Sequence, residues 1–73
     1  MNMYFRRLGD LREDHDYTKR FVAGCLTMQP EVYRRYEKGI REVPVWALIK
    51  LSELYKVSTD YILGLTDDPS RHA

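Results

Sequence analysis

Cysteine is nearly absent from this sequence, since Cys25 is the only one among 73 residues. An internal disulfide is therefore impossible, and a reducing compartment is expected because disulfides persist mainly in oxidising ones. Long apolar runs are also absent, and none approaches the roughly 20 residues that a membrane span needs. Residues 1–10 lack the apolar segment of a signal peptide. We therefore expect a cytoplasmic protein with no membrane association.

Side chains that could form a catalytic or metal site are scarce. His15 and His72 are the two histidines, and their spacing from Cys25 matches no metal site. Cys25 has no evident base partner, so we expect a buried or half-buried small residue rather than a nucleophile. The four glycines are isolated, which excludes a phosphate-cradling loop. These absences predict a protein that is not an enzyme and that needs no cofactor, metal or small-molecule substrate.

Net charge is also low, at +1, which taken alone argues only weakly for nucleic acid. The charge is unevenly distributed, because residues 17–50 carry seven basic and three acidic side chains, and the remainder carries five basic and eight acidic ones. Positive charge therefore gathers where a phosphate-facing surface would have to lie. The alternative interpretation is a solvated surface of mixed charge.

The apolar spacing predicts five helices and no strands in a single domain. An apolar content of 44% and a charged content of 32% are typical of a folded chain. The predicted helices span residues 3–14, 19–26, 30 to 37 or 38, 44 to about 55, and 59–63. Residues 1–65 form the domain, and the polar segment 66–73 is expected to be a loose C-terminal tail.

Several helix ends carry clear local signals. Thr18 and Ser58 are suited to N-cap the second and fifth helices. Pro30 suits the first position of the third helix, because its missing N–H would be unpaired there anyway. Gly39 and Gly64 end the third and fifth helices by accepting a left-handed backbone.

The second and third helices are joined by a turn at residues 27–29, which is the layout of a helix-turn-helix. Such a motif places its second helix in the major groove of DNA.

The residues expected to face the core are Phe5, Leu8, Leu11, Val22, Ala23, Leu26, Met28, Tyr33, Tyr36, Val45, Leu48, Leu51, Leu54 and Tyr55.

The chain resembles the lambda-repressor-like (Cro-like or XRE) helix-turn-helix transcriptional regulators over roughly Phe5 to Asp68. The residues that carry the resemblance are LRED at 11–14, Thr18 with Val22-Ala23 and Leu26, YRRYEKGIREVP at 33–44, and LIKLSELYKVSTDYILGLTDDP at 48–69. This resemblance implies a compact all-α fold of five helices that binds double-stranded DNA as a homodimer, with the third helix in the major groove.

The resemblance also implies roles for individual residues. Base reading falls to the exposed face of the third helix, at Pro30, Glu31, Arg34 and Arg35. Phosphate contact falls to Thr18, Lys19, Gln29, Lys38 and Arg41. An ion pair between Arg12 and Glu37 would tie the first helix to the third; if the two charges were independent surface groups, the pair would contribute little.

The chemistry of the third helix supports part of this assignment. Arg34 and Arg35 can each bring a planar fork to guanine O6 and N7, the commonest specific contact in the major groove. Only one of the two neighbours needs to face the groove, and the other would meet phosphate. The alternative is a solvated helix face stabilised by pairs such as Glu31 with Arg35.

Three residues depart from the family pattern near the turn. Pro30 stands where family members often carry a glutamine that reads adenine, so that contact is absent or moved to Gln29. Glu31 can accept a hydrogen bond from cytosine N4 and would act as a specificity filter. Thr27 occupies a turn position usually filled by Gly or Asn, and a β-branched residue tolerates positive φ poorly, so we expect a turn of different shape.

Phe21 and Trp46 are apolar where the family usually has polar residues. One interpretation is that they fold back into the core. The other is that one or both contact a second copy or a protein partner, since aromatic residues are enriched at interface centres.

The sequence therefore predicts a sequence-specific DNA-binding transcriptional regulator, expected to act as a repressor and a homodimer. The alternative from another class is a protein-interaction module, antitoxin-like or partner-binding, that keeps the fold and has lost DNA reading. Pro30, Glu31, the low net charge, Phe21 and Trp46 favour that alternative.

Overall fold

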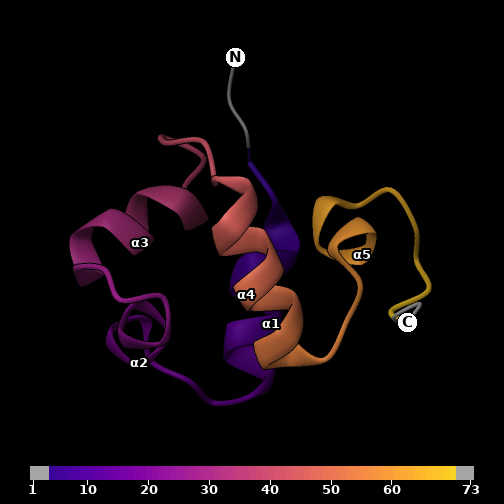
Figure 1. Cartoon of the computed structure of the whole chain (residues 1–73), viewed down its shortest axis with the longest axis horizontal. Helices are drawn as coiled ribbons and strands as arrows, with labels where there is room; N and C mark the ends of the chain where they lie inside the picture. The colour runs from indigo at the N-terminus through magenta and orange to yellow at the C-terminus, as the bar shows by residue number, and fades with distance from the viewer. Residues whose placement is uncertain (1–3, 71–73) are drawn as a thin grey trace.

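The computed structural model describes residues 4–70, and this part of the chain contains five helices and no strand (Figure 1). The all-α, five-helix fold predicted from the sequence is thereby confirmed. The elements in chain order are α1 (Arg6–Asp14), α2 (Lys19–Cys25), α3 (Pro30–Glu37), α4 (Val45–Tyr55) and α5 (Thr59–Leu63). Helix α2 packs on α3, α4 packs on α5, and α1 contacts both α3 and α5.

The predicted capping residues all occupy the expected positions. Thr18 Oγ1 accepts a hydrogen bond from the Phe21 N–H at 3.0 Å, and Ser58 Oγ accepts one from the Tyr61 N–H at 3.0 Å. Both bonds satisfy an N–H group that a helix start leaves unpaired. Gly64, with φ = 79°, caps the end of α5 in the left-handed region.

Gly39 follows α3 with φ = 73°, also as predicted. A second constraint acts at this position, because a Cβ on Gly39 would lie 3.0 Å from both Cα and Cβ of Tyr4. The glycine therefore allows the N-terminal segment to pass directly against the end of α3.

Three predicted helix boundaries shift. Helix α1 begins at Arg6, after an extended Phe5, and the predicted start at Met3 lies outside the described residues. Leu26 and Pro44 flank α2 and α4 as cap residues instead of lying inside them. Such shifts are small because a cap residue is already half helical.

The core draws on every helix, and its largest fully buried side chains are Leu8, Val22, Leu26, Tyr33, Leu51 and Ile62. One prediction about α4 is wrong, because Val45 is 71% exposed. The buried stripe instead follows Ala47, Leu51 and Tyr55, which are spaced four apart. Val45 lies two residues before Ala47, on the opposite side of the helix.

The turn between α2 and α3 contains Thr27 in a left-handed backbone conformation, with φ = 53°. We had expected the branched side chain to disfavour positive φ here and to change the shape of the turn. Thr27 nevertheless adopts the left-handed conformation. Its hydroxyl donates to the Leu26 carbonyl at 2.6 Å, and Met28 packs partly buried against the core beneath the turn.

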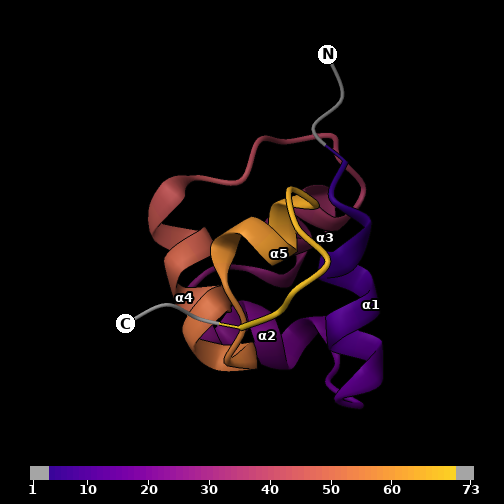
Figure 2. The same ribbon diagram turned by 90° about the vertical axis from the view of Figure 1, so that its right-hand side faces the viewer.

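The first part of the segment expected to be a loose tail is anchored to the body. Arg7 on α1 donates to the carbonyls of Tyr61 and Thr66 at 2.7 and 2.5 Å, and to Asp67 Oδ1 at 2.6 Å. The Ser58 N–H donates to the Pro69 carbonyl at 3.0 Å. Figure 2 shows this segment doubling back alongside α5. Residues 71–73 of the expected tail lie outside the described residues.

Candidate nucleic-acid interface

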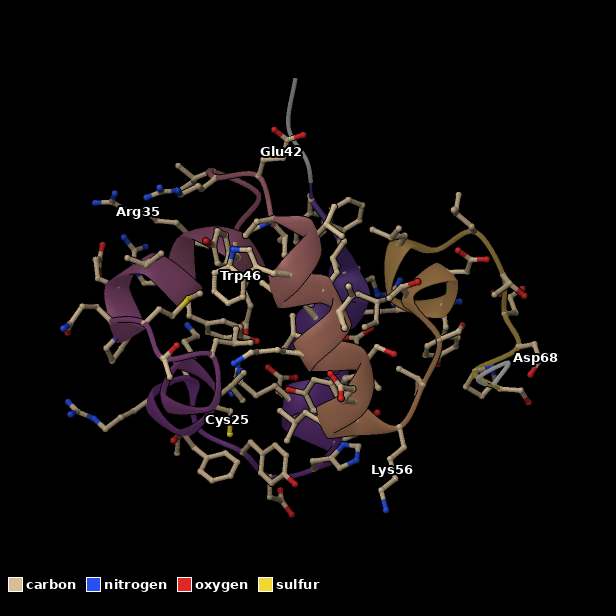
Figure 3. The ribbon with its side chains drawn as sticks, viewed as in Figure 1. Cys25, Arg35, Glu42, Trp46, Lys56 and Asp68 are labelled. Carbon is tan, nitrogen blue, oxygen red and sulfur yellow. The ribbon has the colours of Figure 1, made fainter. Side chains whose placement is uncertain are left out.

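The outer face of α3 is a row of charged side chains. Tyr33 and Tyr36 are buried at 0% and 4% exposure, which fixes the opposite side of the helix toward solvent. Glu31, Arg34 and Arg35 occupy that side with side-chain exposures of 57%, 36% and 46%. Figure 3 shows Arg35 pointing away from the body of the protein. The third helix thus presents the guanidinium groups of Arg34 and Arg35 outward.

Glu31 lies between the two arginines. Its Oε2 accepts from Arg34 Nε at 3.1 Å and its Oε1 accepts from Arg34 Nη2 at 2.6 Å, a two-pronged contact. Arg35 Nε lies 3.7 Å from Oε1, within ion-pair range but beyond hydrogen-bond distance. The hydrogen bonds from Arg34 lower the pKa of the Glu31 carboxyl below its ordinary value. The helical spacing suggested a pair between Glu31 and Arg35, whereas the arginine that lies closer to Glu31 is Arg34.

The residues expected to contact phosphate lie around the ends of α2 and α3. Lys38 and Arg41 are exposed on either side of Gly39, and Gln29 is the exposed N-cap residue of α3. Thr18 is exposed at the start of α2, and the adjacent Lys19 is half-buried. The Thr18 oxygen already accepts from Phe21 N–H, so its hydroxyl hydrogen is what it can offer to a phosphate. Pro30, the first residue of α3, is half-buried.

Arg12 and Glu37 join α1 to the end of α3. Arg12 Nε donates to Glu37 Oε2 at 2.7 Å and Nη2 donates to Oε1 at 3.4 Å, with the two side chains 13% and 9% exposed. Arg12 Nη1 also donates to the Tyr17 carbonyl at 3.0 Å. The hydrogen bond with Glu37 raises the pKa of the Arg12 guanidinium. Because the pair is mostly shielded from water, removal of one partner would leave the other charge poorly solvated and uncompensated.

Two buried phenols lie near this ion pair, and sequence reasoning did not anticipate their polar ends. The hydroxyl oxygens of Tyr33 and Tyr55 are buried, and within residues 4–70 neither has a hydrogen-bond partner. Burial raises the pKa of both phenols above the ordinary value of 10.0. The apolar spacing identified both residues as core, but it could not say where their hydroxyl groups end.

Phe21 and Trp46 are 49% and 48% exposed, so the interpretation that they fold into the core is wrong. Phe21 packs on the ring of Tyr17, with centroids 4.6 Å apart. Trp46 shares the outer face of α4 with Val45 and Ile49, which are 71% and 50% exposed. Val45, Trp46 and Ile49 therefore form an apolar patch, open to solvent, on the outer face of the first turns of α4.

Cys25 is exposed, which corrects the burial expected from the sequence (Figure 3). It ends α2, and that helix turns Val22 and Ala23 inward instead. Among residues 4–70 no group of three or more His, Cys, Asp or Glu side chains could hold a metal ion. None of the helices in this range has the length and apolar character to cross a membrane.

Comparison with known proteins places this geometry in context. The chain is 43% identical over 67 residues to the uncharacterized HTH-type transcriptional regulator YobD of Bacillus subtilis, a match that covers 92% of this chain and 60% of YobD. It is 39% identical over 59 residues to the HTH-type transcriptional regulator ImmR of the same organism, covering 81% of this chain and 46% of ImmR. The HTH-type transcriptional regulator AnsR is 31% identical over 62 residues, covering 85% of this chain and 53% of AnsR.

This chain is homologous to helix-turn-helix transcriptional regulators over most of its length. The resemblance found from the sequence is thereby confirmed, and the names of all three relatives describe regulators, not enzymes. The chain spans about half to three fifths of the length of these curated relatives. No family model matches the chain, and no solved structure matches it significantly.

Proposed function

We propose that this chain is the DNA-binding domain of a sequence-specific transcriptional regulator, a repressor that binds its operator as a homodimer. In this mechanism α3 enters the major groove of each half-site, and the half-sites lie roughly one helical turn apart. Repression then follows from occupancy of the operator. The homology to HTH-type regulators supports the class of function.

The observation that carries this proposal is the outer face of α3. Tyr33 and Tyr36 fill the core side of the helix, and Arg34 and Arg35 project from the other side. No segment among residues 4–70 buries that face, so it is free to meet a nucleic-acid groove. The Arg12–Glu37 pair sets the angle at which α1 and the rest of the body present it.

Lys38 and Arg41, exposed just beyond the end of α3, supply phosphate contacts in this proposal. Each neutralised phosphate releases counterions, so affinity falls with salt in proportion to the number of contacts. These contacts give affinity and register, and the base contacts of α3 give the sequence preference.

Salt-dependent binding to random duplex DNA tests the proposal. We expect the logarithm of affinity to fall linearly with the logarithm of salt concentration, and each of Lys38→Gln and Arg41→Gln to reduce the slope by about one. Lys56→Gln is the matched control, because Lys56 lies at the end of α4, far from Arg35 (Figure 3). Absence of any slope in the unmodified chain would refute DNA binding.

A protein-interaction module remains the second candidate because of one observation, the apolar patch on the outer face of α4. Val45, Trp46 and Ile49 are 71%, 48% and 50% exposed. In the proposed regulator this face, or Phe21, joins the two copies of the dimer. In the alternative it receives a different protein, and the duplex-binding experiment separates the two.

A further inference from the structure

The guanidinium of Arg34 has two edges, and Glu31 occupies only one of them. The carboxylate takes the Nε and Nη2 hydrogens that face it, at 3.1 and 2.6 Å. An arginine carries five N–H donors in a rigid plane, so Nη1 and the second hydrogen of Nη2 form another fork at the tip. Among the described residues, Arg34 Nη1 has no hydrogen-bond partner.

We propose that Glu31 is a positioning residue that holds Arg34 so that the tip of its guanidinium reads guanine. This inference rests on the proposed function, and it names the base that the outer face of α3 recognises. Guanine offers two acceptors in the major groove, O6 and N7, which a two-donor fork matches. Adenine offers one acceptor and one donor there, so the same fork meets an N–H group and is rejected.

The contact also assigns different roles to the two arginines. Arg34 is held by two hydrogen bonds to Glu31, which restrict the orientation of its plane. Arg35 lies 3.7 Å from the same carboxylate, too far for a hydrogen bond, and its side chain is the more exposed at 46%. A plane held by hydrogen bonds suits base reading, and a charge that makes no hydrogen bond to Glu31 suits a phosphate. Arg34 is therefore the base reader and Arg35 the phosphate contact.

Glu31 itself is not the base reader in this arrangement. Both of its oxygens face Arg34, and Oε1 also faces Arg35. The carboxylate keeps free acceptor sites, but cytosine N4 is a neutral donor and would bind it more weakly than the arginine partners do. The role of Glu31 as a specificity filter is then indirect. It restricts the orientations of Arg34 before DNA is met, so less side-chain freedom is lost on binding.

The test starts from a duplex selected by the unmodified chain from a random pool. Each guanine in that duplex is replaced in turn by adenine and by 7-deazaguanine, which lacks N7, and the affinity of each duplex is measured at fixed salt. We expect one guanine whose preference over adenine disappears in Arg34→Ala. At that same guanine, Glu31→Gln should reduce the preference roughly tenfold, which corresponds to about 1.4 kcal/mol.

Two further variants make the result specific. Arg35→Ala should weaken binding to all duplexes alike, because a phosphate contact carries no base information. Glu53→Gln is the matched control, since it removes the same charge from an exposed position on α4, and it should leave the preference unchanged. Glu31→Gln also removes a negative charge beside the groove, so its affinity for random duplex should stay equal or rise. Glu31 is exposed, and thermal melting of each variant checks that the fold is intact.

Three outcomes would overturn the proposal, and they are distinguishable. If Glu31→Gln keeps the full guanine preference that depends on Arg34, Glu31 does not position Arg34 for base reading. If Glu31→Gln instead changes the preference at a cytosine that Arg34→Ala does not affect, Glu31 reads a base directly. If the unmodified chain binds no duplex in a salt-dependent way, the proposed function itself fails. If the unmodified chain binds DNA but Glu31→Gln leaves the guanine preference unchanged, only this inference is refuted and the proposed function stands.

Discussion

Replacing Glu37 by glutamine tests how much the fold and the proposed interface depend on one ion pair. The substitution keeps the shape of the side chain and one oxygen, but it removes the negative charge from a partly buried site where the Arg12 side chain is only 13% exposed. Removing one partner of a buried pair costs about 3–5 kcal/mol, and removing one of an exposed pair costs about 1 kcal/mol or less. Because glutamine keeps one acceptor for Arg12, we expect a loss of about 2 kcal/mol.

Thermal unfolding followed by circular dichroism at pH 7 measures this loss. For a domain of this size 1 kcal/mol shifts the midpoint by about 4–8 °C, so Glu37→Gln should unfold about 8–16 °C below the unmodified chain. Operator affinity measured well below both midpoints should also fall, because Glu37 fixes α3 against α1. A lower midpoint with unchanged affinity would separate the stabilising role from the presentation of α3.

Glu13→Gln is the control, since it removes a second carboxylate from the same arginine. Glu13 Oε1 lies 3.8 Å from Arg12 Nη2, and its side chain is 71% exposed. Water screens such a contact, so its removal should cost less than about 0.5 kcal/mol. If Glu37→Gln and Glu13→Gln both melted within about 2 °C of the unmodified chain, the argument from burial would be refuted.

Three other predictions follow from the described contacts. Gly39→Ala should lower the unfolding free energy by about 2 kcal/mol, because its backbone has φ = 73° and the new Cβ would meet Tyr4 at 3.0 Å; urea unfolding measures this, and an unchanged midpoint would contradict it. Burial raises the pKa of Tyr33 and Tyr55 above 10.0, so stability is fully present below pH 10 and should fall above it by up to about 1.4 kcal/mol per pH unit for each phenol. Melting at pH 9 to 11 measures this fall in stability, which should be smaller in Tyr33→Phe than in the unmodified chain. An equal fall in both would mean that the Tyr33 phenol ionises freely in the folded chain. Trp46→Ala should weaken self-association in sedimentation at high protein concentration, and a chain that is monomeric with or without Trp46 would exclude this residue from a dimer contact.

The features that the sequence determined by itself are local ones. Thr18 and Ser58 cap α2 and α5 because an N-cap hydroxyl reaches an N–H only three residues ahead. Gly39 and Gly64 could be placed after their helices because glycine adopts the left-handed backbone without a Cβ clash. Tyr33 and Tyr36 could be assigned to the core from spacing alone, and their burial then defines the outward face of α3 by subtraction.

The partner of Glu31 lay at the limit of what spacing can decide. Residues three and four apart on a helix are both within reach, so the pattern could not choose between Arg34 and Arg35. The pairing of Arg12 with Glu37 came from family resemblance, since no local rule connects residues 25 positions apart.

Only the tertiary structure decided which helix faces meet. Arg7 reaches Thr66 and Asp67 because α1 packs beside α5, a contact across 59 and 60 positions of the sequence. The exposure of Val45 and Trp46 depends in the same way on how far the neighbouring segments extend over α4. The identity of an apolar residue does not tell whether a neighbouring segment covers its side chain. Burial is a property of the packed arrangement, whereas capping and backbone handedness belong to a few consecutive residues.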